Sequence, residues 1–596
     1  MKLSKLYSNQ NTIFEPIVFN NGFNVVYGDI RHPERYELDT HNLGKTTLAK
    51  LLDFMFLAKR HPKQFLFKHE ERFAEFIFFL ELELADGSYL TIRRSIKENT
   101  RIFFKKHNEK QQDFSSLTDN LWSHGDVAID NAKVLLEGWL HFDILSQYPY
   151  RKIIGYLVRT QEDFRNVFKL NKEAGKDLYW KPYMADLLGF DGDLAKQHYE
   201  KLAEVNKLKD KISAISLSDM DNVTKELSKI DNKLLLRQKE LTKLQEFIDN
   251  FNFDEIDQEK IEQLVNSIDN EIANLNMREY SIKNNIHRIN ESLNTVSIKF
   301  NTSEIENLFK EANILFPEEV SKDFNQLIDF NKAITKERKK FLKEELSELQ
   351  SELVFIEDQL ESLNLERANH LSFLSETKLV TKFRESNKEI ARVQAEIAFL
   401  DKQKENIDEI QSLTKGKRAL ETELDSIQDD MQVNLTEVNE VTDSVFSNVR
   451  IYFNEIISKV FNKEGSITVY LNKNGNFEFD ATYQDFQGNN TSEGDGNTYG
   501  KFLCIAFDLA VARAYLDKNY PKFLYIDGAL EVLDDRKRKL LLEVLREYSS
   551  LGIQIIITTI SSETSGFPQN PFNDKEIVLT FHDDGKNGRL FKMPAW

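Results

Sequence analysis

Residues 39–47 read Asp39-Thr40-His41-Asn42-Leu43-Gly44-Lys45-Thr46-Thr47. A strand-like run ends at Tyr27 before this stretch, and an apolar, helix-like run begins at Leu48 after it. A strand, a loop ending in Gly-Lys-Thr and a helix form the context in which backbone N–H groups cradle phosphates and lysine neutralises them. The threonine hydroxyl of such a loop binds Mg²⁺. The predicted phosphate-binding residues are His41, Asn42, Leu43, Gly44, Lys45, Thr46 and Thr47.

The loop departs from the full pattern GxxxxGK[ST] at its first glycine. Asp39 occupies that position, and the nearest earlier glycine is Gly28. The connection between the strand and the lysine is therefore longer than usual. A chance Gly-Lys-Thr at the start of a helix is the alternative interpretation, and the C-terminal part of the chain argues against it.

The C-terminal part supplies an apolar strand that ends in an acid. Phe523-Leu524-Tyr525-Ile526 leads into Asp527, which lies 481 positions after Thr46. A carboxylate at the end of such a strand holds Mg²⁺ in enzymes that transfer phosphoryl groups. A plain turn at a strand end is the alternative. Together, Thr46 and Asp527 predict one nucleotide site that is split between the two ends of the chain.

Two further segments are candidates for the same site. Ser492, Glu493 and Gly494 precede a helix-like run, and small residues at a helix start allow a second subunit to approach a γ-phosphate. Gln161 lies in a polar loop and is a candidate for a glutamine that senses the metal. A plain loop is the alternative in both cases. The predicted metal-binding residues are Thr46, Gln161 and Asp527.

The residues expected to drive hydrolysis are atypical. A glutamate that polarises the attacking water would normally follow the magnesium aspartate, but Gly528 occupies that position. Glu531 is the nearest acid, at a different offset, so Asp527 and Glu531 are the predicted catalytic residues. Thr559 stands where a histidine would be expected after the next strand. The sequence therefore predicts that ATP and Mg²⁺ bind and leaves hydrolysis slow or in doubt.

The middle of the chain reads as long helix. Between Pro182 and Pro521 the only proline is Pro317, and apolar residues recur at three- and four-residue steps among charged ones. This pattern is typical of a coiled coil. The pattern weakens around Pro317, so we place the reversal of an antiparallel hairpin at roughly 300–335. Two irregular stretches, 247–253 and 379–383, flank it and would face each other as an elbow.

The ends of the chain differ from the middle. Residues 73–106 and 467–479 alternate like hairpin strands around Asp86-Gly87 and Asn474-Gly475, and 554–560 form a buried-strand run. We predict an α/β head formed by both chain ends, with a long antiparallel coiled-coil insertion and a helical hinge. The predicted domains are 1–190 (first half of the head), 191–300 (outgoing coil, elbow near 247–256), 301–335 (apex), 336–445 (returning coil) and 446–596 (second half of the head).

Composition narrows the functional classes. The chain has 596 residues, a net charge of −19 and one cysteine, Cys504, which excludes a disulfide framework and fits a reducing cytoplasm. No apolar run reaches the length of a membrane helix. The negative charge argues against indiscriminate nucleic-acid binding. A local basic stretch could follow a phosphate backbone, although a solvated strand edge explains it equally well: Arg93, Arg94, Lys97, Arg101, Lys105 and Lys106.

With these motifs, the chain resembles SMC-type ABC ATPases in its split head, long coil and central hinge. More narrowly, it is similar to the SMC-like ATPases of three-component ABC (Lamassu-type) bacterial anti-phage systems. The narrower resemblance rests on the extended loop before Gly44-Lys45-Thr46, on Ser492-Glu493-Gly494 in place of Leu-Ser-Gly-Gly, on Phe507-Asp508-Leu509-Ala510, on Asp527-Gly528 in place of Asp-Glu, and on residues 326–342. It implies a homodimer through the heads, binding of DNA ends or structured DNA, a small accessory subunit, and an effector, often a nuclease.

Our leading hypothesis is an ATP-binding, DNA-sensing scaffold that dimerises through its heads and controls an effector nuclease in anti-phage or anti-plasmid defence. The second hypothesis is a DNA-repair ATPase that hydrolyses ATP while guiding a nuclease to breaks, which requires a working general base. A third is a structural coiled-coil protein with a vestigial head. ABC transport heads lack a coil insertion of this length, which argues against a membrane transporter subunit.

Overall fold

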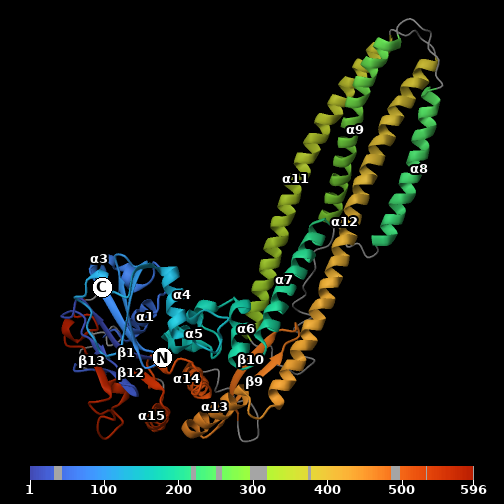
Figure 1. Cartoon of the computed structure of the whole chain (residues 1–596). Helices are drawn as coiled ribbons and strands as arrows, with labels where there is room; N and C mark the ends of the chain where they lie inside the picture. The colour runs from blue at the N-terminus through green and yellow to red at the C-terminus, as the bar shows by residue number, and fades with distance from the viewer. Residues whose placement is uncertain are drawn as a thin grey trace. The chain divides into compact units, whose positions relative to one another are not determined.

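The computed structural model describes residues 1–32, 43–215, 223–249, 258–294, 318–372, 378–484, 497–531 and 533–594 (Figure 1). Contacts divide the chain into two compact units. The head unit consists of Met1–Glu204 and Leu420–Trp596, and the arm unit is Val205–Ala419. The predicted mixture of α/β structure with many helices is confirmed.

The strands all lie in the head unit. They are β1 (Lys2–Ser8), β2 (Ile17–Val18), β3 (Phe23–Asp29), β4 (Ile77–Glu83), β5 (Tyr89–Ser95), β6 (Arg101–His107), β7 (His124–Ala128), β8 (Val158–Arg159), β9 (Glu464–Leu471), β10 (Phe477–Gln484), β11 (Phe523–Ile526), β12 (Gln554–Ile560) and β13 (Ile577–His582).

The helices that lie within the head unit are shorter than those of the arm unit. They are α1 (Lys45–Met55), α2 (Phe65–Lys68), α3 (Glu70–Phe73), α4 (Ile129–Leu140), α5 (Tyr150–Leu157), α6 (Asp177–Leu187), α13 (Val445–Phe461), α14 (Asn497–Ala514) and α15 (Asp535–Ser550). The two helices that run from the head unit into the arm unit are α7 (Gly192–Ile215) and α12 (Lys378–Glu440).

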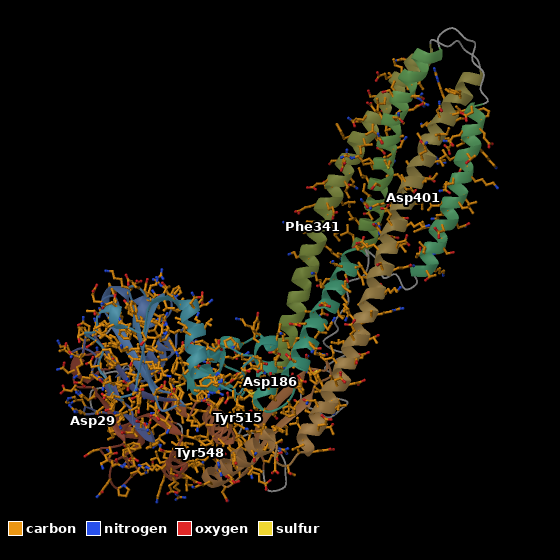
Figure 2. All side chains as sticks on the ribbon, viewed as in Figure 1. Asp29, Asp186, Phe341, Asp401, Tyr515 and Tyr548 are labelled. Atoms are coloured by element: carbon orange, nitrogen blue, oxygen red, sulfur yellow. The ribbon has the colours of Figure 1, made fainter. Side chains whose placement is uncertain are left out.

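A five-stranded parallel sheet joins the two ends of the chain. Its order is β13-β3-β12-β11-β8, so β3 pairs on both sides with strands from the C-terminal end. Continuous apolar runs such as 555–557 build it, because a parallel sheet is covered on both faces. Val25 and Ile557 are fully buried in the resulting core. Figure 2 marks Asp29 at the end of β3, the edge from which the loop toward α1 departs.

A six-stranded sheet of order β2-β1-β4-β5-β6-β7 completes the N-terminal part of the head unit, and β9 and β10 form a separate two-stranded sheet. The predicted hairpins are confirmed. Gly87 (φ 79°) turns between β4 and β5, and Gly475 (φ 73°) turns between β9 and β10. Both glycines have the left-handed backbone that these tight turns require and that side chains disfavour.

The arm unit contains α8 (Val223–Asp249), α9 (Gln258–Asn294) and α11 (Glu318–Ser372), besides parts of α7 and α12. Ion pairs show how the helices associate. Asp231 of α8 lies 2.7 Å from Lys404 of α12, and Asp269 of α9 lies 2.8 Å from Arg367 of α11. The outgoing and returning helices thus pair as an antiparallel coil, as the apolar repeat predicts.

The coil is not a simple extended hairpin, because α12 also packs against the α9–α11 pair. Tyr280 of α9 stacks edge-on with Phe399 of α12 at 4.9 Å between ring centroids, and Ala391 of α12 is buried with Ile272 and Ile356. The arm unit therefore folds back on itself at its bends. Figure 2 shows its side chains projecting outward along the helices, as at Phe341, which is 66% exposed.

The structure shifts two predicted boundaries in the arm unit. Helix α11 ends at Ser372 and α12 begins at Lys378, so residues 379–383, predicted to be an irregular elbow, belong to α12. Residues 318–335, assigned to the apex from the sequence, form the start of α11. Pro317 lies outside the described residues. In the part of the chain that the structure describes, no helix has the length and apolar character needed to cross a bilayer.

Candidate functional site

The carboxyl ends of the parallel strands bring the two predicted halves of the site together. Ile526 pairs with Arg159 of β8 on one side and with Ile557 of β12 on the other. The carboxyl ends of these strands therefore lie at one edge of the sheet. Asp527 follows β11, Gln161 comes shortly after β8, and Thr558 belongs to the last part of β12. In open parallel sheets, ligands bind outside the carboxyl ends of the strands.

Helix α1 is attached to β11 by two hydrogen bonds at its first turn. The Tyr525 hydroxyl donates to the Lys45 carbonyl oxygen at 2.9 Å, and Thr46 Oγ1 donates to Asp527 Oδ2 at 2.7 Å. These two contacts hold the start of α1 against the end of β11. They also place the Thr46 hydroxyl beside the Asp527 carboxylate. The predicted halves, 481 residues apart in the chain, meet in a direct contact.

The first turn of α1 has features that suit an anion. No acidic residue lies in its first turn, and no side chain caps it. Lys45 is buried there, only 6% exposed. Gly44 has φ 113°, and a Cβ atom at this position would lie 2.6 Å from Cβ of Leu590. The first-turn N–H groups and the lysine therefore form an electropositive end that suits phosphate.

The aspartate is held from both sides. Thr558 Oγ1 donates to Asp527 Oδ1 at 2.8 Å and accepts from the backbone N–H of Gly528 at 2.7 Å. A hydroxyl and a carboxylate are the oxygen ligands that Mg²⁺ prefers, with phosphate and water oxygens completing the shell. The described residues contain no cluster of three or more acidic, histidine or cysteine side chains able to hold a metal alone. Thr46 and Asp527 therefore fit a metal that arrives with phosphates.

The Glu531 carboxylate lies next to Gly528, the position directly after Asp527, although Glu531 comes later in the sequence. The backbone N–H of Glu531 donates to the Gly528 carbonyl oxygen at 3.2 Å, so the chain turns back after Asp527. A Cβ atom added at Gly528 (φ 64°) would lie 2.7 Å from Glu531 Oε2. The Glu531 carboxylate thus occupies the space into which a side chain at position 528 would project.

Two side chains orient this carboxylate. Lys501 of α14 lies 3.1 Å from Glu531 Oε2 and is itself 7% exposed, whereas Gln161 Nε2 donates to the same oxygen at 3.4 Å. The structure therefore brings Gln161, Glu531 and Asp527 to one edge. Sequence reasoning missed Lys501 and Thr558. The available signals were a lone lysine in an apolar helix and a threonine at the end of a buried strand.

A buried ion pair connects the Gln161 loop to α14. Arg159 Nε donates to Asp508 Oδ2 at 2.8 Å and Nη2 donates to Oδ1 at 2.9 Å. The same guanidinium also donates to the carbonyl oxygen of Val167 at 2.6 Å. Burial raises the pKa of Asp508 to about 6, while Arg159 acts in the opposite direction. The carboxylate is therefore ionised at neutral pH, and the loop is held rigidly against the helix.

Some of the remaining predicted site residues lie in the described part of the chain, and the others lie outside it. Leu43 is buried and its carbonyl oxygen accepts from the Leu590 N–H at 3.1 Å, and Thr47 lies in the first turn of α1. Thr559, at the position where a histidine would be expected, donates to Glu563 Oε2 at 2.7 Å. The predicted residues outside the described part of the chain are His41, Asn42, Ser492, Glu493 and Gly494.

The basic stretch on β5 and β6 is largely engaged inside the head unit. Arg94 is fully buried and donates to the Asn99 carbonyl oxygen at 3.0 Å. Arg93 pairs with Asp119 and stacks on Phe103. The other engaged cations are Arg101 (with Asp126), Lys105 (with the Leu121 carbonyl oxygen) and Lys106 (with Asp86). The strand-edge interpretation is therefore favoured over a phosphate-tracking surface.

Comparison with known proteins gives partial matches. Residues 452–595 match a family described as an uncharacterised protein conserved in bacteria (DUF2326). The chain is 22% identical over 421 residues, 68% of each chain, to the uncharacterized protein YydD of Bacillus subtilis (strain 168).

Two similar solved structures are Smc head domains. One, from Pyrococcus yayanosii with a coiled coil and joint, is 13% identical, with a TM-score of 0.34 over 94% of this chain and 92% of that one. The other, from Pyrococcus furiosus, has an extended coiled coil and is bound to the C-terminal domain of ScpA. It is 10% identical, with a TM-score of 0.31 over 94% and 90%.

Proposed function

We propose that the chain binds Mg²⁺·ATP at the edge of its parallel sheet, in a site that both ends of the chain build. The observation that carries this proposal is the 2.7 Å hydrogen bond between Thr46 and Asp527 at the first turn of α1. Lys45 and the first-turn N–H groups would hold the phosphates, and Thr46 and Asp527 would hold the metal. When bound, Mg²⁺ neutralises the charge that develops on the phosphate oxygens.

Binding measurements with matched variants test this site. We expect Lys45→Ala to weaken Mg²⁺·ATP binding roughly 10- to 150-fold, because a hydrogen bond to a charged group contributes about 1.5–3 kcal/mol. Lys50→Ala is the control, since Lys50 lies exposed on the same helix. Equal affinities of the two variants would refute the site, as would a lack of nucleotide binding by the wild-type chain.

We further propose that Glu531 is the general base. Its carboxylate lies where a residue directly after Asp527 would project, next to Gln161, and it accepts from both Gln161 and Lys501. A base in this place takes a proton from the attacking water. The ion pair with Lys501 orients the carboxylate but competes with the water for its oxygen. Slow turnover is the expected consequence.

Dimerisation through the heads follows as the next part of the proposal. The segment containing Ser492, Glu493 and Gly494 precedes α14, whose Lys501 contacts the base. We propose that this segment meets the nucleotide of a second copy, so that ATP joins two heads. Light scattering with ATP and Mg²⁺ tests this. The Glu531→Gln variant should remain dimeric after ATP and Mg²⁺ are added. The Lys45→Ala variant should keep the oligomeric state that it has without nucleotide.

The finer role is proposed from the resemblance to SMC-type ATPases. The dimer would sense DNA ends or structured DNA and, with a small accessory subunit, control an effector nuclease in defence. DNA binding measured with and without ATP tests this role, and an absence of ATP-dependent binding to any DNA form would overturn it. The placement of Glu531 favours a second candidate, a repair ATPase with steady turnover. DNA-stimulated hydrolysis that Glu531→Gln abolishes would support that alternative.

A further inference from the structure

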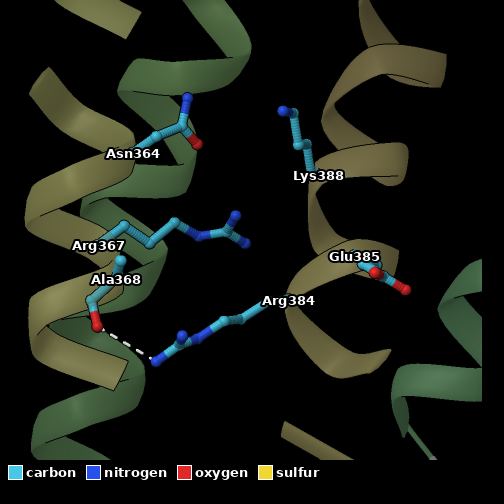
Figure 3. A pocket seen from close by; sticks show the side chains of 6 residues that line it. All are labelled: Asn364, Arg367, Ala368, Arg384, Glu385 and Lys388. Carbon is cyan, nitrogen blue, oxygen red and sulfur yellow. Dashed lines mark hydrogen bonds between the residues drawn. The ribbon is translucent and has the colours of Figure 1, made fainter. Parts of the chain in front are cut away.

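A small cavity lies at the bend of the arm unit, where α11 ends and α12 begins. Its volume is about 190 Å³. Three residues of each helix line it: Asn364, Arg367 and Ala368 of α11, and Arg384, Glu385 and Lys388 of α12. Figure 3 shows that the two helices face each other across it.

The guanidinium of Arg367 is buried at this cavity with unused donors. Arg367 is 4% exposed, and its Nε lies 2.8 Å from Asp269 Oδ1. Among the described residues, its buried Nη2 has no hydrogen-bond partner. In Figure 3 the guanidinium extends from α11 toward α12. A buried donor without an acceptor costs about 1–3 kcal/mol, so this arrangement indicates a missing acceptor.

Two more cations reach into the same space from α12. Arg384 Nη2 donates to the Ala368 carbonyl oxygen at 3.1 Å, and its buried Nε is also unpartnered within the described part of the chain. The Lys388 side chain points toward α11 in Figure 3. Glu385 points the other way and lines a neighbouring hollow with Leu244 and Phe247. The side of the cavity between the helices is therefore cationic.

We propose that this cavity binds a small oxyanion of the phosphate class between Arg367, Arg384 and Lys388. Planar guanidinium groups match the spacing of phosphate oxygens, and lysine adds a mobile positive charge. The oxyanion would supply the acceptors that Arg367 Nη2 and Arg384 Nε lack. The buried position of Arg367 favours a free oxyanion over the backbone of a DNA duplex.

The bound oxyanion would clamp the bend. It would join α11 to α12 directly and offset the positive charge of Arg384 and Lys388, which adds to that of Arg367, paired on one side with Asp269. A ligand that binds only the folded-back form stabilises that form by RT ln(1 + L/Kd), where L is the free ligand concentration. The bend of the arm unit would therefore respond to the phosphate concentration, independently of nucleotide bound near Lys45.

Hydrogen exchange on the full chain tests the proposal. Potassium phosphate is compared with potassium chloride at matched ionic strength. At ten times the Kd, phosphate should slow exchange about tenfold in peptides covering residues 360–372 and 384–391. The readout is local to α11 and α12, so phosphate at the nucleotide site does not contribute. Absence of phosphate-specific protection in the wild-type chain would overturn the proposal.

Matched variants locate the effect. Arg384→Gln and Lys388→Gln should remove most of the protection. Lys402→Gln should keep it, because Lys402 is an exposed cation of α12 that pairs with Glu405. Equal loss in all three variants would mean a general charge effect and would refute the site. Protection by a short DNA duplex but not by phosphate would also refute a free oxyanion as the ligand.

Discussion

Substitution of Gly528 by alanine tests whether Glu531 works from its displaced position. The new Cβ would lie 2.7 Å from Glu531 Oε2, whereas non-bonded heavy atoms settle at about 3.5–4.0 Å. The carboxylate must therefore move by about 1 Å. A displacement of that size can reduce the rate of a chemical step roughly 10²-fold. The left-handed backbone (φ 64°) adds about 1–2 kcal/mol of strain.

Gly175 offers a control that separates the clash from the strain. It has φ 73°, and nothing lies within 4 Å of a Cβ atom added there. Gly175→Ala should therefore reduce stability by a similar amount and leave hydrolysis unchanged. Glu531→Gln should reduce hydrolysis about 10²- to 10⁴-fold, the contribution typical of a general base.

The assay is single-turnover hydrolysis of ATP with the protein in excess, which detects slow chemistry. Nucleotide affinity is measured in parallel and should change little in Gly528→Ala and Glu531→Gln, because Lys45 and Thr46 are intact. Equal rates for Gly528→Ala and Gly175→Ala would refute the reasoning. Wild-type turnover in Glu531→Gln, or no turnover in the wild type, would also refute it.

Three further predictions concern neighbouring residues. Thr558→Val should cost about 1–3 kcal/mol of stability, because it leaves the buried Gly528 N–H without an acceptor, and it should weaken Mg²⁺-dependent binding since Asp527 loses a donor. Arg159→Lys should loosen the Gln161 loop, because lysine cannot reproduce the bidentate contact with Asp508. His198 is buried, which lowers its pKa, so the folded state binds fewer protons and stability should fall as pH drops below about 6.5.

Each of these predictions has a direct measurement. Urea unfolding of Thr558→Val, compared with the wild type, gives the stability change, and an unchanged midpoint would contradict it. Hydrogen exchange in residues 160–167 reports on Arg159→Lys, and unaltered protection there would contradict a holding role. For His198→Gln, the unfolding midpoint should depend less on pH between about pH 5 and 7 than in the wild type. Identical pH profiles would contradict the assignment.

Much of the fold could be predicted because its signals are local. The hairpins at Gly87 and Gly475 follow from turn residues between alternating strands, and 554–560 follows from an apolar run. The long helices follow from the scarcity of proline and glycine. The fold-back of the arm unit could not be predicted, because contacts such as Tyr280 with Phe399 join faces that look equally polar in an amphipathic repeat.

The site could be predicted in outline but not in its chemistry. Thr46 and Asp527 belong to recognisable strand and helix patterns, so their meeting could be anticipated. The position of Glu531 depends on a turn in which its backbone N–H donates to the Gly528 carbonyl oxygen. The spacing of residues in the sequence does not reveal this turn. Lys501 and Thr558 act through partners far away in the chain. The roles of these two residues can therefore be identified only from the contacts in the folded structure.

The order of strands in the parallel sheet has a consequence for biosynthesis. Strand β3 has β12 and β13 as its neighbours, and β8 has β11, so neither N-terminal strand pairs with a strand made near it in time. At roughly 5–20 residues per second, the ribosome needs on the order of 25–100 s to reach Asp527 after Thr46. Throughout that interval the nascent chain holds an unpaired β3, which chaperones would have to shield. A chain that is released before β11, β12 and β13 are made cannot complete the parallel sheet.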